Sequence, residues 1–243
     1  MDLRRIAAQM VGDGSDQMIL VVGASRGVGQ YLFSRYAEAG EAAYGTFNST
    51  RVTGGRFIKT DVTSAREVEN LRDTLVSKGL ENLSIVYCAG VADNAFLHKS
   101  VVEEWRKAVE VNLIGVYHVA RYFLPIMREQ GFGRIIVLSS VVAQRGVRGT
   151  SAYASSKAGL WGLARTVALE NGSKGITMNN INLGYAAIGM GETHISDEFR
   201  AELQNAIPTK RFCSPEEIFS AVEFLRNTEY MNGVSIDLSG GLV

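Results

Sequence analysis

The sequence predicts a single α/β domain with a doubly wound parallel sheet, Rossmann-like, with helices on both faces. Short apolar runs alternate with amphipathic stretches of helical period along most of the chain. A glycine-rich turn follows the first of these runs, and no internal repeat or low-complexity linker divides the 243 residues. Strand–helix–strand units are connected right-handed within one sheet, so the helices are expected to cover both of its faces.

Each element can be assigned from its own pattern. The run "MILVV" at 18–22 ends in glycine and has the composition of a buried strand. The helix after it is expected to stop at Gly40, and "SAREVENLRDTLVSKG" predicts a helix with a capping box formed by Ser64 and Glu67. The other strands are expected at 42–47, 56–60, 83–90, 133–140, 175–183 and 234–241, and the other helices at 101–130, 151–171 and 214–227.

Composition excludes several classes of function. Lys and Arg total 25, equal to Asp and Glu, so the bulk charge favours neither nucleic acid nor an anionic membrane surface. No apolar run approaches the roughly 20 residues of a membrane helix, and residues 1–17 lack the pattern of a secretory signal. Cys88 and Cys213 are too few for a disulfide framework or a zinc cluster, so we expect no metal and a cytoplasmic location. Residues 1–17 are expected to be a leader or a short added helix, without an assigned function.

The motif "VVGASRGVG" places Gly23, Gly27 and Gly29 between the first strand and the first helix. Glycines let a backbone turn sharply and approach a pyrophosphate, while a helix N-terminus offers N–H donors. Glycines also collect in tight turns for steric reasons alone. The strand–turn–helix context favours a dinucleotide site, so residues 18–243 are expected to form a dinucleotide-binding domain.

The second strand indicates which dinucleotide is bound. Sites selective for a plain ribose usually carry an acid at the end of this strand, but "YGTFNST" offers Thr46 and Asn48 and no acid. Arg26, within the glycine turn, is able to pair with a phosphate bidentately. We therefore expect NADP(H) rather than NAD; the alternative is that Arg26 is an ordinary surface charge.

The stretch "SAYASSKAG" sets Tyr153 and Lys157 four residues apart, one turn apart on a helix. A cation beside a phenol favours the phenolate, which suits a group that exchanges protons near neutral pH. The alternative is a Tyr/Lys pair on a solvated helix face.

Six motifs in a fixed order resemble the short-chain dehydrogenase/reductase family. They are "GASRGVG", "DVT" at 61–63, "CAG" at 88–90, "VN" at 111–112, "SS" at 139–140 and "YASSK" at 153–157. The resemblance runs from about residue 18 to the C-terminus and is strongest to the branch that contains 3-oxoacyl-(acyl carrier protein) reductases.

The resemblance implies four catalytic residues. Tyr153 would be the general acid in ketone reduction, and Lys157 would hold the nicotinamide ribose and, with the charge of the oxidised cofactor, lower the phenol pKa. Ser140 would donate a hydrogen bond to the substrate carbonyl. Asn112 would kink its helix and hold a water that links Lys157 to solvent. The alternatives are that Ser139 and Ser140 bond their own backbone and that Asn112 is a polar residue tolerated in a helix.

The resemblance also implies the residues that contact the cofactor. Asp61 and Val62 would flank the adenine, although Asp61 alone is compatible with a cap on the following helix. Besides Tyr153 and Lys157, the implied contacts are Gly23, Ser25, Arg26, Gly27, Val28, Gly29, Thr46, Asn48, Asp61, Val62, Cys88, Ala89, Gly90, Ala186 and Ile188.

The chain departs from the family pattern at four places. Tyr87 and Cys88 replace two asparagines, so only backbone contacts carry over with "CAG". Leu183 replaces a proline, and Ile188 stands where a threonine is usual. The segment between the second and third strands is short enough that its usual helix is expected to be missing.

Substrate signals are weaker. A glycine-containing segment at about 185–212 lies where the family keeps a mobile substrate lid. Arg134 and Lys174 lie where relatives present basic residues to an acidic carrier protein, and an ordinary surface role is slightly favoured for both. The expected substrate wall mixes apolar and basic residues: Val141, Val142, Gln144, Arg145, Val147 and Arg148.

Together these observations predict an NADPH-dependent reductase of a ketone, most consistent with a 3-oxoacyl thioester on an acyl carrier protein. Acyl carrier protein is a possible partner, and a homodimer or homotetramer is implied by resemblance alone. One alternative is the same chemistry on a polyketide, a sugar or another secondary alcohol. The other is an NADP-binding regulator or scaffold with weak catalysis, suggested by the altered "YCAG" and "LG" positions.

Overall fold

The computed structural model describes residues 17–50, 52, 54–189 and 196–243. Seven strands form one sheet in the order β3-β2-β1-β4-β5-β6-β7, and every neighbouring pair is parallel. The predicted fold class is therefore confirmed. The expectations for residues 1–16, and for the part of the lid at 190–195, lie outside the described residues.

The elements alternate along the chain as the sequence pattern predicts. The strands are β1 (Met18–Val22), β2 (Ala42–Phe47), β3 (Phe57–Lys59), β4 (Ser84–Tyr87), β5 (Gly133–Ser140), β6 (Ile176–Leu183) and β7 (Ser235–Leu238). The longer helices are α2 (Gly27–Glu38), α3 (Ala65–Ser77), α4 (Val102–Val109), α5 (Gly115–Gln130), α7 (Ser151–Asn171), α8 (Asp197–Ala206) and α9 (Pro215–Asn227). Shorter helical segments are Leu97–Lys99, Glu110–Ile114, α6 (Val142–Arg145) and Gly172–Lys174.

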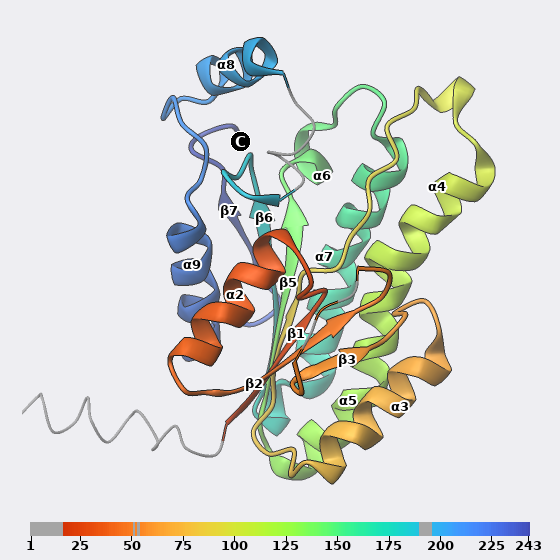
Figure 1. The fold of residues 1–243 in the computed structure, drawn as a ribbon, viewed down its shortest axis with the longest axis vertical. Helices are drawn as coiled ribbons and strands as arrows, with labels where there is room; N and C mark the ends of the chain where they lie inside the picture. Colours follow the sequence, from red (N-terminus) through yellow and green to blue (C-terminus); the bar gives the residue numbers. More distant parts are fainter. Residues whose placement is uncertain (1–16, 51, 53, 190–195) are drawn as a thin grey trace, which may run out of the picture.

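The helices form a layer on each face of the sheet (Figure 1). Helices α2 and α9 lie on one face, and α3, α5 and α7 lie on the other. Alternate residues of β1 enter the two cores: Leu20 packs on the α3/α5/α7 side, whereas Ile19 and Val21 pack on the α2/α9 side. All three are fully buried, as expected for a central strand covered on both faces.

The predicted helix at 101–130 is present but interrupted. Residues Glu110–Ile114 form a π-helical turn between α4 and α5. Strand β4 ends at Tyr87, so Cys88 to Gly90 lie in a loop rather than in the predicted strand. Among the described residues between β2 and β3 there is no helix, as expected. Helices α6 and α8 were not predicted.

The predicted capping box on α3 is only half present. The Ser64 side chain accepts a hydrogen bond from the Glu67 N–H at 3.3 Å. The Glu67 carboxylate, however, accepts from the Asp61 N–H at 2.8 Å instead of from Ser64. Glu67 therefore joins the start of α3 to the loop that follows β3. A complete box occurs at α9, where Ser214 and Glu217 bond reciprocally.

Arg134 is buried in the structure, whereas both interpretations of its role place it on the surface. Its side chain is 3% exposed, and the guanidinium donates to the carbonyls of Gly133, Gly175 and Arg226 at 2.8–3.1 Å. It also pairs with the exposed carboxylate of Glu229 at 2.8 Å. Arg134 therefore ties the starts of β5 and β6 to the end of α9. Lys174 is exposed, as expected.

Candidate active site

The predicted site residues gather at the carboxyl edge of the sheet. Strand order reverses between β1 and β4, and ligands of open α/β sheets bind in the crevice at such a switch point. The backbone after β1 lies directly beside the backbone after β4, because the Cys88 N–H donates to the Val22 carbonyl at 2.8 Å. A Cβ added at Gly23 would lie 2.7 Å from the backbone of Ala89. The glycine turn and the Cys88–Gly90 loop therefore face one crevice.

The turn between β1 and α2 has the conformation that its glycines predict. Gly23 and Gly27 have φ values of 83° and 57°, which side-chain-bearing residues rarely adopt. Gly29 is packed so closely on the Gly23 carbonyl that a Cβ there would collide with it. Helix α2 has no acidic residue in its first turn, and no side chain caps its N-terminus. Its first N–H groups are thus arranged to receive an anion such as a pyrophosphate.

The segment after β6 lies against the same turn. A Cβ added at Gly27 would be 2.9 Å from the Cα of Gly189, so the two backbones are in contact. Ala186 is buried, and Ile188 is half-buried just before this contact. The predicted cofactor residues Ala186 and Ile188 therefore lie close to the glycine turn, together with Gly189, which the sequence did not indicate.

Thr46, on β2, holds the glycine turn through two hydrogen bonds. Its side chain is buried, its hydroxyl accepts the Gly23 N–H at 3.0 Å, and its carbonyl accepts the Ala24 N–H at 2.8 Å. Asn48 is exposed just beyond the end of β2. Arg26 is exposed at the N-cap of α2 and has no acidic partner in the part of the chain that the structure describes. Ser25 and Val28 are half-exposed beside it.

Asp61 does not cap α3, because Ser64 is the N-cap. Its carboxylate instead accepts hydrogen bonds from the N–H and the hydroxyl of Thr63, at 2.9 and 2.8 Å. Val62 is 7% exposed, and its carbonyl bonds to the His118 imidazole at 2.9 Å. Hydrogen bonds therefore hold the Asp61–Val62 pair in place just after β3.

Asn112 is fully buried and lies in the π-helical turn, which interrupts the regular α-helix at the residue where a kink is expected. Its side-chain amide forms two hydrogen bonds with the backbone of Val91. Oδ1 accepts the Val91 N–H and Nδ2 donates to the Val91 carbonyl, both at 2.9 Å. Nδ2 also donates to the Ser156 hydroxyl at 3.0 Å. Asn112 therefore fixes the loop after β4 and is more than a polar residue tolerated in a helix.

Tyr153 and Ser140 meet at the end of β5. Burial raises the pKa of the Tyr153 phenol, and a hydrogen bond with the Ser140 side chain opposes that rise. The Ser140 hydroxyl also accepts the Val142 N–H at 3.2 Å, so both the substrate-binding role and the local backbone role suit its geometry. Ser139 does not bond its own backbone; it donates to the Lys157 carbonyl at 3.2 Å.

Lys157 lies behind the phenol. Its side chain is 4% exposed, and Nζ donates to the Leu138 carbonyl at 2.6 Å and lies 5.7 Å from the centre of the Tyr153 ring. Burial lowers the pKa of Lys157 to about 8, and the nearby Cys88 opposes this shift. Burial raises the pKa of the Cys88 thiol to about 12, and the charge of Lys157 opposes this rise. From the sequence we expect that Lys157 lowers the pKa of Tyr153. In the structure, the group that opposes the rise of this pKa is Ser140.

Gly90 shows how closely these groups converge. A Cβ added there would lie 3.3 Å from Asn112 Oδ1 and 3.8 Å from Lys157 Nζ. The structure therefore brings the Asn112, Ser140, Tyr153 and Lys157 side chains together behind the Cys88–Gly90 loop.

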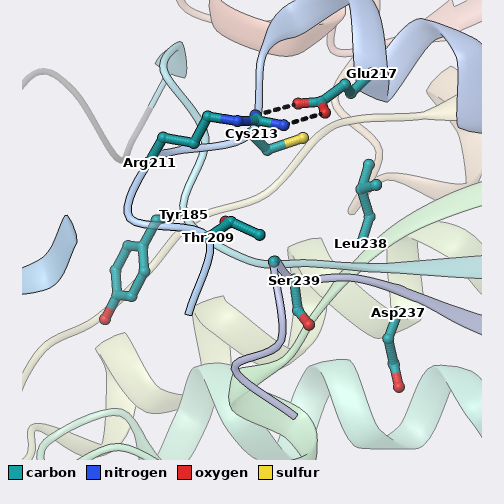
Figure 2. A pocket seen from close by; sticks show the side chains of 9 residues that line it. Tyr185, Thr209, Arg211, Cys213, Glu217, Asp237, Leu238 and Ser239 are labelled. Carbon is teal, nitrogen blue, oxygen red and sulfur yellow. Dashed lines mark hydrogen bonds and ion pairs between the residues drawn. The ribbon is translucent and has the colours of Figure 1, made fainter. Parts of the chain in front are cut away.

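The expected lid segment has joined ends. The Ala187 N–H donates to the Cys213 carbonyl, and the Cys213 N–H donates to the Tyr185 carbonyl, both at 2.9 Å. Figure 2 shows Arg211 bound to Glu217 of α9, beside Cys213; Nη1 and Nη2 each donate to one carboxylate oxygen. These contacts line a cavity of about 230 Å³ that also includes residues of β7. The two ends of the segment are therefore anchored to one another and to α9.

The expected substrate wall lies on α6 and the loop after it. Val141 is buried, and Gln144 bonds the Asp237 carboxylate on β7. Val142 is half-buried, and Val147 is 40% exposed. Arg145 and Arg148 are exposed, and neither forms an ion pair with any residue that the structure describes.

The described residues contain neither a membrane-spanning helix nor a cluster of metal ligands. None of their helices is long and apolar enough to cross a bilayer. None of their His, Cys, Asp and Glu side chains cluster in a way that would hold a metal ion.

Comparison with known proteins places this site in context. Residues 27–243 match the family model described as enoyl-(acyl carrier protein) reductase. The chain is 30% identical to the 3-oxoacyl-(acyl carrier protein) reductase FabG of Escherichia coli, over 93% of this chain and 97% of that protein. It is 38% identical to the acetoacetyl-CoA reductase of Allochromatium vinosum over 65% of each chain. A variant of the actinorhodin polyketide ketoreductase, solved with NADPH, superimposes with a TM-score of 0.84 at 24% identity, covering 93% of this chain and 97% of that one.

The fold and the similarity define an oxidoreductase that acts on CH–OH groups with NAD(P)H. The chain belongs to the short-chain dehydrogenase/reductase family. The resemblance inferred from the six motifs is thereby confirmed.

Proposed function

We propose that the protein is an NADPH-dependent reductase whose substrate is a 3-oxoacyl thioester carried on a phosphopantetheine arm. The observation that carries this proposal is the convergence of Ser140, Tyr153, Lys157 and Asn112 next to the glycine turn. The geometry of the turn fits a dinucleotide, because Gly23, Gly27 and Gly29 let the backbone approach a pyrophosphate and the N-terminus of α2 has no side-chain cap.

In this reaction the bound cofactor supplies the hydride. Ser140 donates a hydrogen bond to the substrate carbonyl and stabilises the negative charge that develops on its oxygen. Tyr153 gives its phenolic proton to that oxygen. Because burial raises the pKa of Tyr153, the phenol is protonated at neutral pH and suited to act as an acid. Lys157, whose pKa burial lowers to about 8, lies with Nζ 5.7 Å from the centre of the Tyr153 ring and would hold the nicotinamide ribose.

Arg26 supports the choice of NADPH. It is exposed at the N-cap of α2, it has no acidic partner among the described residues, and the end of β2 carries Thr46 and Phe47 but no acid. An Arg–phosphate pair is strong and often bidentate. We expect Arg26→Ala to raise the KM for NADPH at least about tenfold and to leave the KM for NADH unchanged. Equal effects on the two coenzymes would remove Arg26 from this role.

Arg145 and Arg148 support the choice of substrate. Both are exposed in the expected substrate wall and have no ion-pair partner among the described residues. They suit the phosphates of a phosphopantetheine arm or of coenzyme A, while the apolar part of the wall suits an acyl chain. The two relatives named above act on 3-oxoacyl-(acyl carrier protein) and acetoacetyl-CoA, which is consistent with this assignment.

The test compares two thioesters with the same reacting group. Consumption of NADPH is followed with acetoacetyl-CoA and with acetoacetyl-N-acetylcysteamine, which lacks the phosphates. We expect turnover of both, and we expect Arg145→Ala with Arg148→Ala to raise the KM for acetoacetyl-CoA only. Turnover of neither thioester would reject the substrate class, and activity on sugars or polyketides in the same assay would favour the alternative substrates.

The second candidate is a catalytically weak, NADP-binding member of the family that serves as a regulator or scaffold, because Tyr87 and Leu183 replace residues usual in the family. It predicts NADPH binding without turnover of any ketone.

Self-association is also proposed. Val102 on α4, Tyr117 on α5 and Leu169 on α7 are 58%, 48% and 88% exposed, and they would be covered in a homodimer or homotetramer.

A further inference from the structure

Tyr87 occupies an unusual position for a buried tyrosine. It is the last residue of β4, it is 1% exposed, and its hydroxyl donates to the Val111 carbonyl at 2.7 Å. That carbonyl belongs to the peptide that joins Val111 to Asn112, inside the π-helical turn. Gly115 allows this approach, since a Cβ there would collide with the phenol oxygen. The phenol therefore reaches from the sheet into the turn that carries Asn112.

The Asn112 amide makes the return connection. It bonds the N–H and the carbonyl of Val91, four residues after Tyr87. The strand end and the π-helical turn are thus joined at two points, first by the phenol and then by the amide. The Cys88–Gly90 loop is enclosed between these points, and Gly90 lies beside both Asn112 Oδ1 and Lys157 Nζ.

From these two connections between the strand end and the π-helical turn, we infer that Tyr87 is a positioning residue for the proposed reaction and acts through Asn112. Its hydroxyl fixes the peptide plane before Asn112, and so fixes the direction of the amide that holds the loop after β4. The inference rests on the proposed function only for its kinetic consequence. The structural consequence, a fixed Val91 N–H, does not depend on any substrate.

The phenol is suited to this role in two ways. A π-helical turn departs from the regular i→i+4 pattern, so a hydrogen bond from outside the helix helps to define it. Burial raises the pKa of Tyr87 above its usual range, so the hydroxyl stays protonated and remains a donor at any working pH. A phenylalanine would fill the same space without the donor.

The test uses Tyr87→Phe with Tyr36→Phe as the matched control. Tyr36 is also fully buried and donates to Glu223 at 2.8 Å, but it lies on α2, on the opposite face of the sheet. We expect Tyr87→Phe to lower kcat about tenfold with little change in the KM for the ketone, because a slightly displaced group slows the chemical step more than binding. Tyr36→Phe is expected to lower stability without changing kcat.

A double-mutant cycle separates positioning from a general effect on stability. If Tyr87 acts through Asn112, adding Tyr87→Phe to Asn112→Ala produces no further loss of kcat. Additive losses, or equal kcat in Tyr87→Phe and the wild type, would overturn the inference.

Hydrogen exchange at the Val91 N–H provides a readout that needs no turnover. We expect Tyr87→Phe to reduce protection of this amide and Tyr36→Phe to leave it unchanged. Unchanged protection in Tyr87→Phe would contradict the inference even in an active enzyme. Reduced protection in a protein that turns over no ketone would reject the proposed function and support the positioning.

Discussion

The burial of Lys157 predicts that removing this side chain stabilises the protein. Burial lowers the pKa of Lys157 from 10.5 to about 8, so the folded state disfavours the charged ammonium. The substitution Lys157→Met removes the charge and keeps an unbranched side chain of similar length. The Leu138 carbonyl loses its donor in the variant.

The magnitude follows from the shift. A fall of about 2.5 in the pKa corresponds to about 3.5 kcal/mol of unfavourable free energy when the lysine is charged in both states, at about 1.4 kcal/mol for each whole step in pKa. Losing the hydrogen bond from a charged donor costs about 2 kcal/mol. The variant is therefore expected to be about 1.5 kcal/mol more stable than the wild type near pH 7.

The pH dependence is the sharper part of this prediction. The folded pKa lies below the unfolded value, so the penalty is fully present below the folded pKa of about 8 and disappears as the pH rises toward 10.5. Between about pH 7 and about pH 9.5 the wild type should gain about 2 kcal/mol relative to Lys157→Met. Guanidinium denaturation of both proteins at the two pH values measures this difference. A stability difference that does not change with pH would refute the reasoning, since it would mean that the lysine is not charged and desolvated in the fold.

Three further predictions concern the stability of the fold, cofactor binding at the glycine turn and the pKa of Tyr153. Arg134→Met should lower the free energy of unfolding by about 3 kcal/mol, because three carbonyls lose a buried donor, and denaturant melts measure it. Gly27→Ala should weaken NADPH binding at least about tenfold in a fluorescence titration, whereas Gly40→Ala, with the same sign of φ but nothing within 4 Å, should lower only stability, by about 1 kcal/mol. Ser140→Ala removes the hydrogen bond that opposes the rise of the Tyr153 pKa, so the pH profile of alcohol oxidation should move to higher pH; an unmoved profile would show that the two hydroxyls are not coupled.

Much of the fold was predictable because its determinants are local. The turn between β1 and α2 follows from glycines at positions with positive φ, and the parallel sheet follows from alternating strands and helices. The Tyr153–Lys157 pair required only helical spacing. The resemblance to a known family then indicated Asn112 and Ser140, and the structure brings all four together.

The parts that sequence reasoning missed depend on contacts between distant segments. The charge in "GRIIVLSS" gives no sign that Arg134 is buried, because its acceptors on Gly175 and Arg226 lie 41 and 92 residues away. Tyr87 was noted only as a departure from the family pattern, since its partner Val111 is 24 residues away. The π-helical turn at Glu110–Ile114 was hidden because the apolar pattern continues on both sides of it. The pKa of Tyr153 also depends on how deeply the phenol is buried, and the spacing of residues in the sequence does not reveal burial.

The central claim is that Tyr153 supplies the proton in an NADPH-dependent carbonyl reduction. Tyr153→Phe keeps the ring and removes the hydroxyl, so NADPH binding should be unchanged. Turnover of acetoacetyl-CoA, measured as consumption of NADPH, should fall at least about a hundredfold, the contribution expected of a positioned general acid. Turnover that is unaffected by Tyr153→Phe would contradict the account.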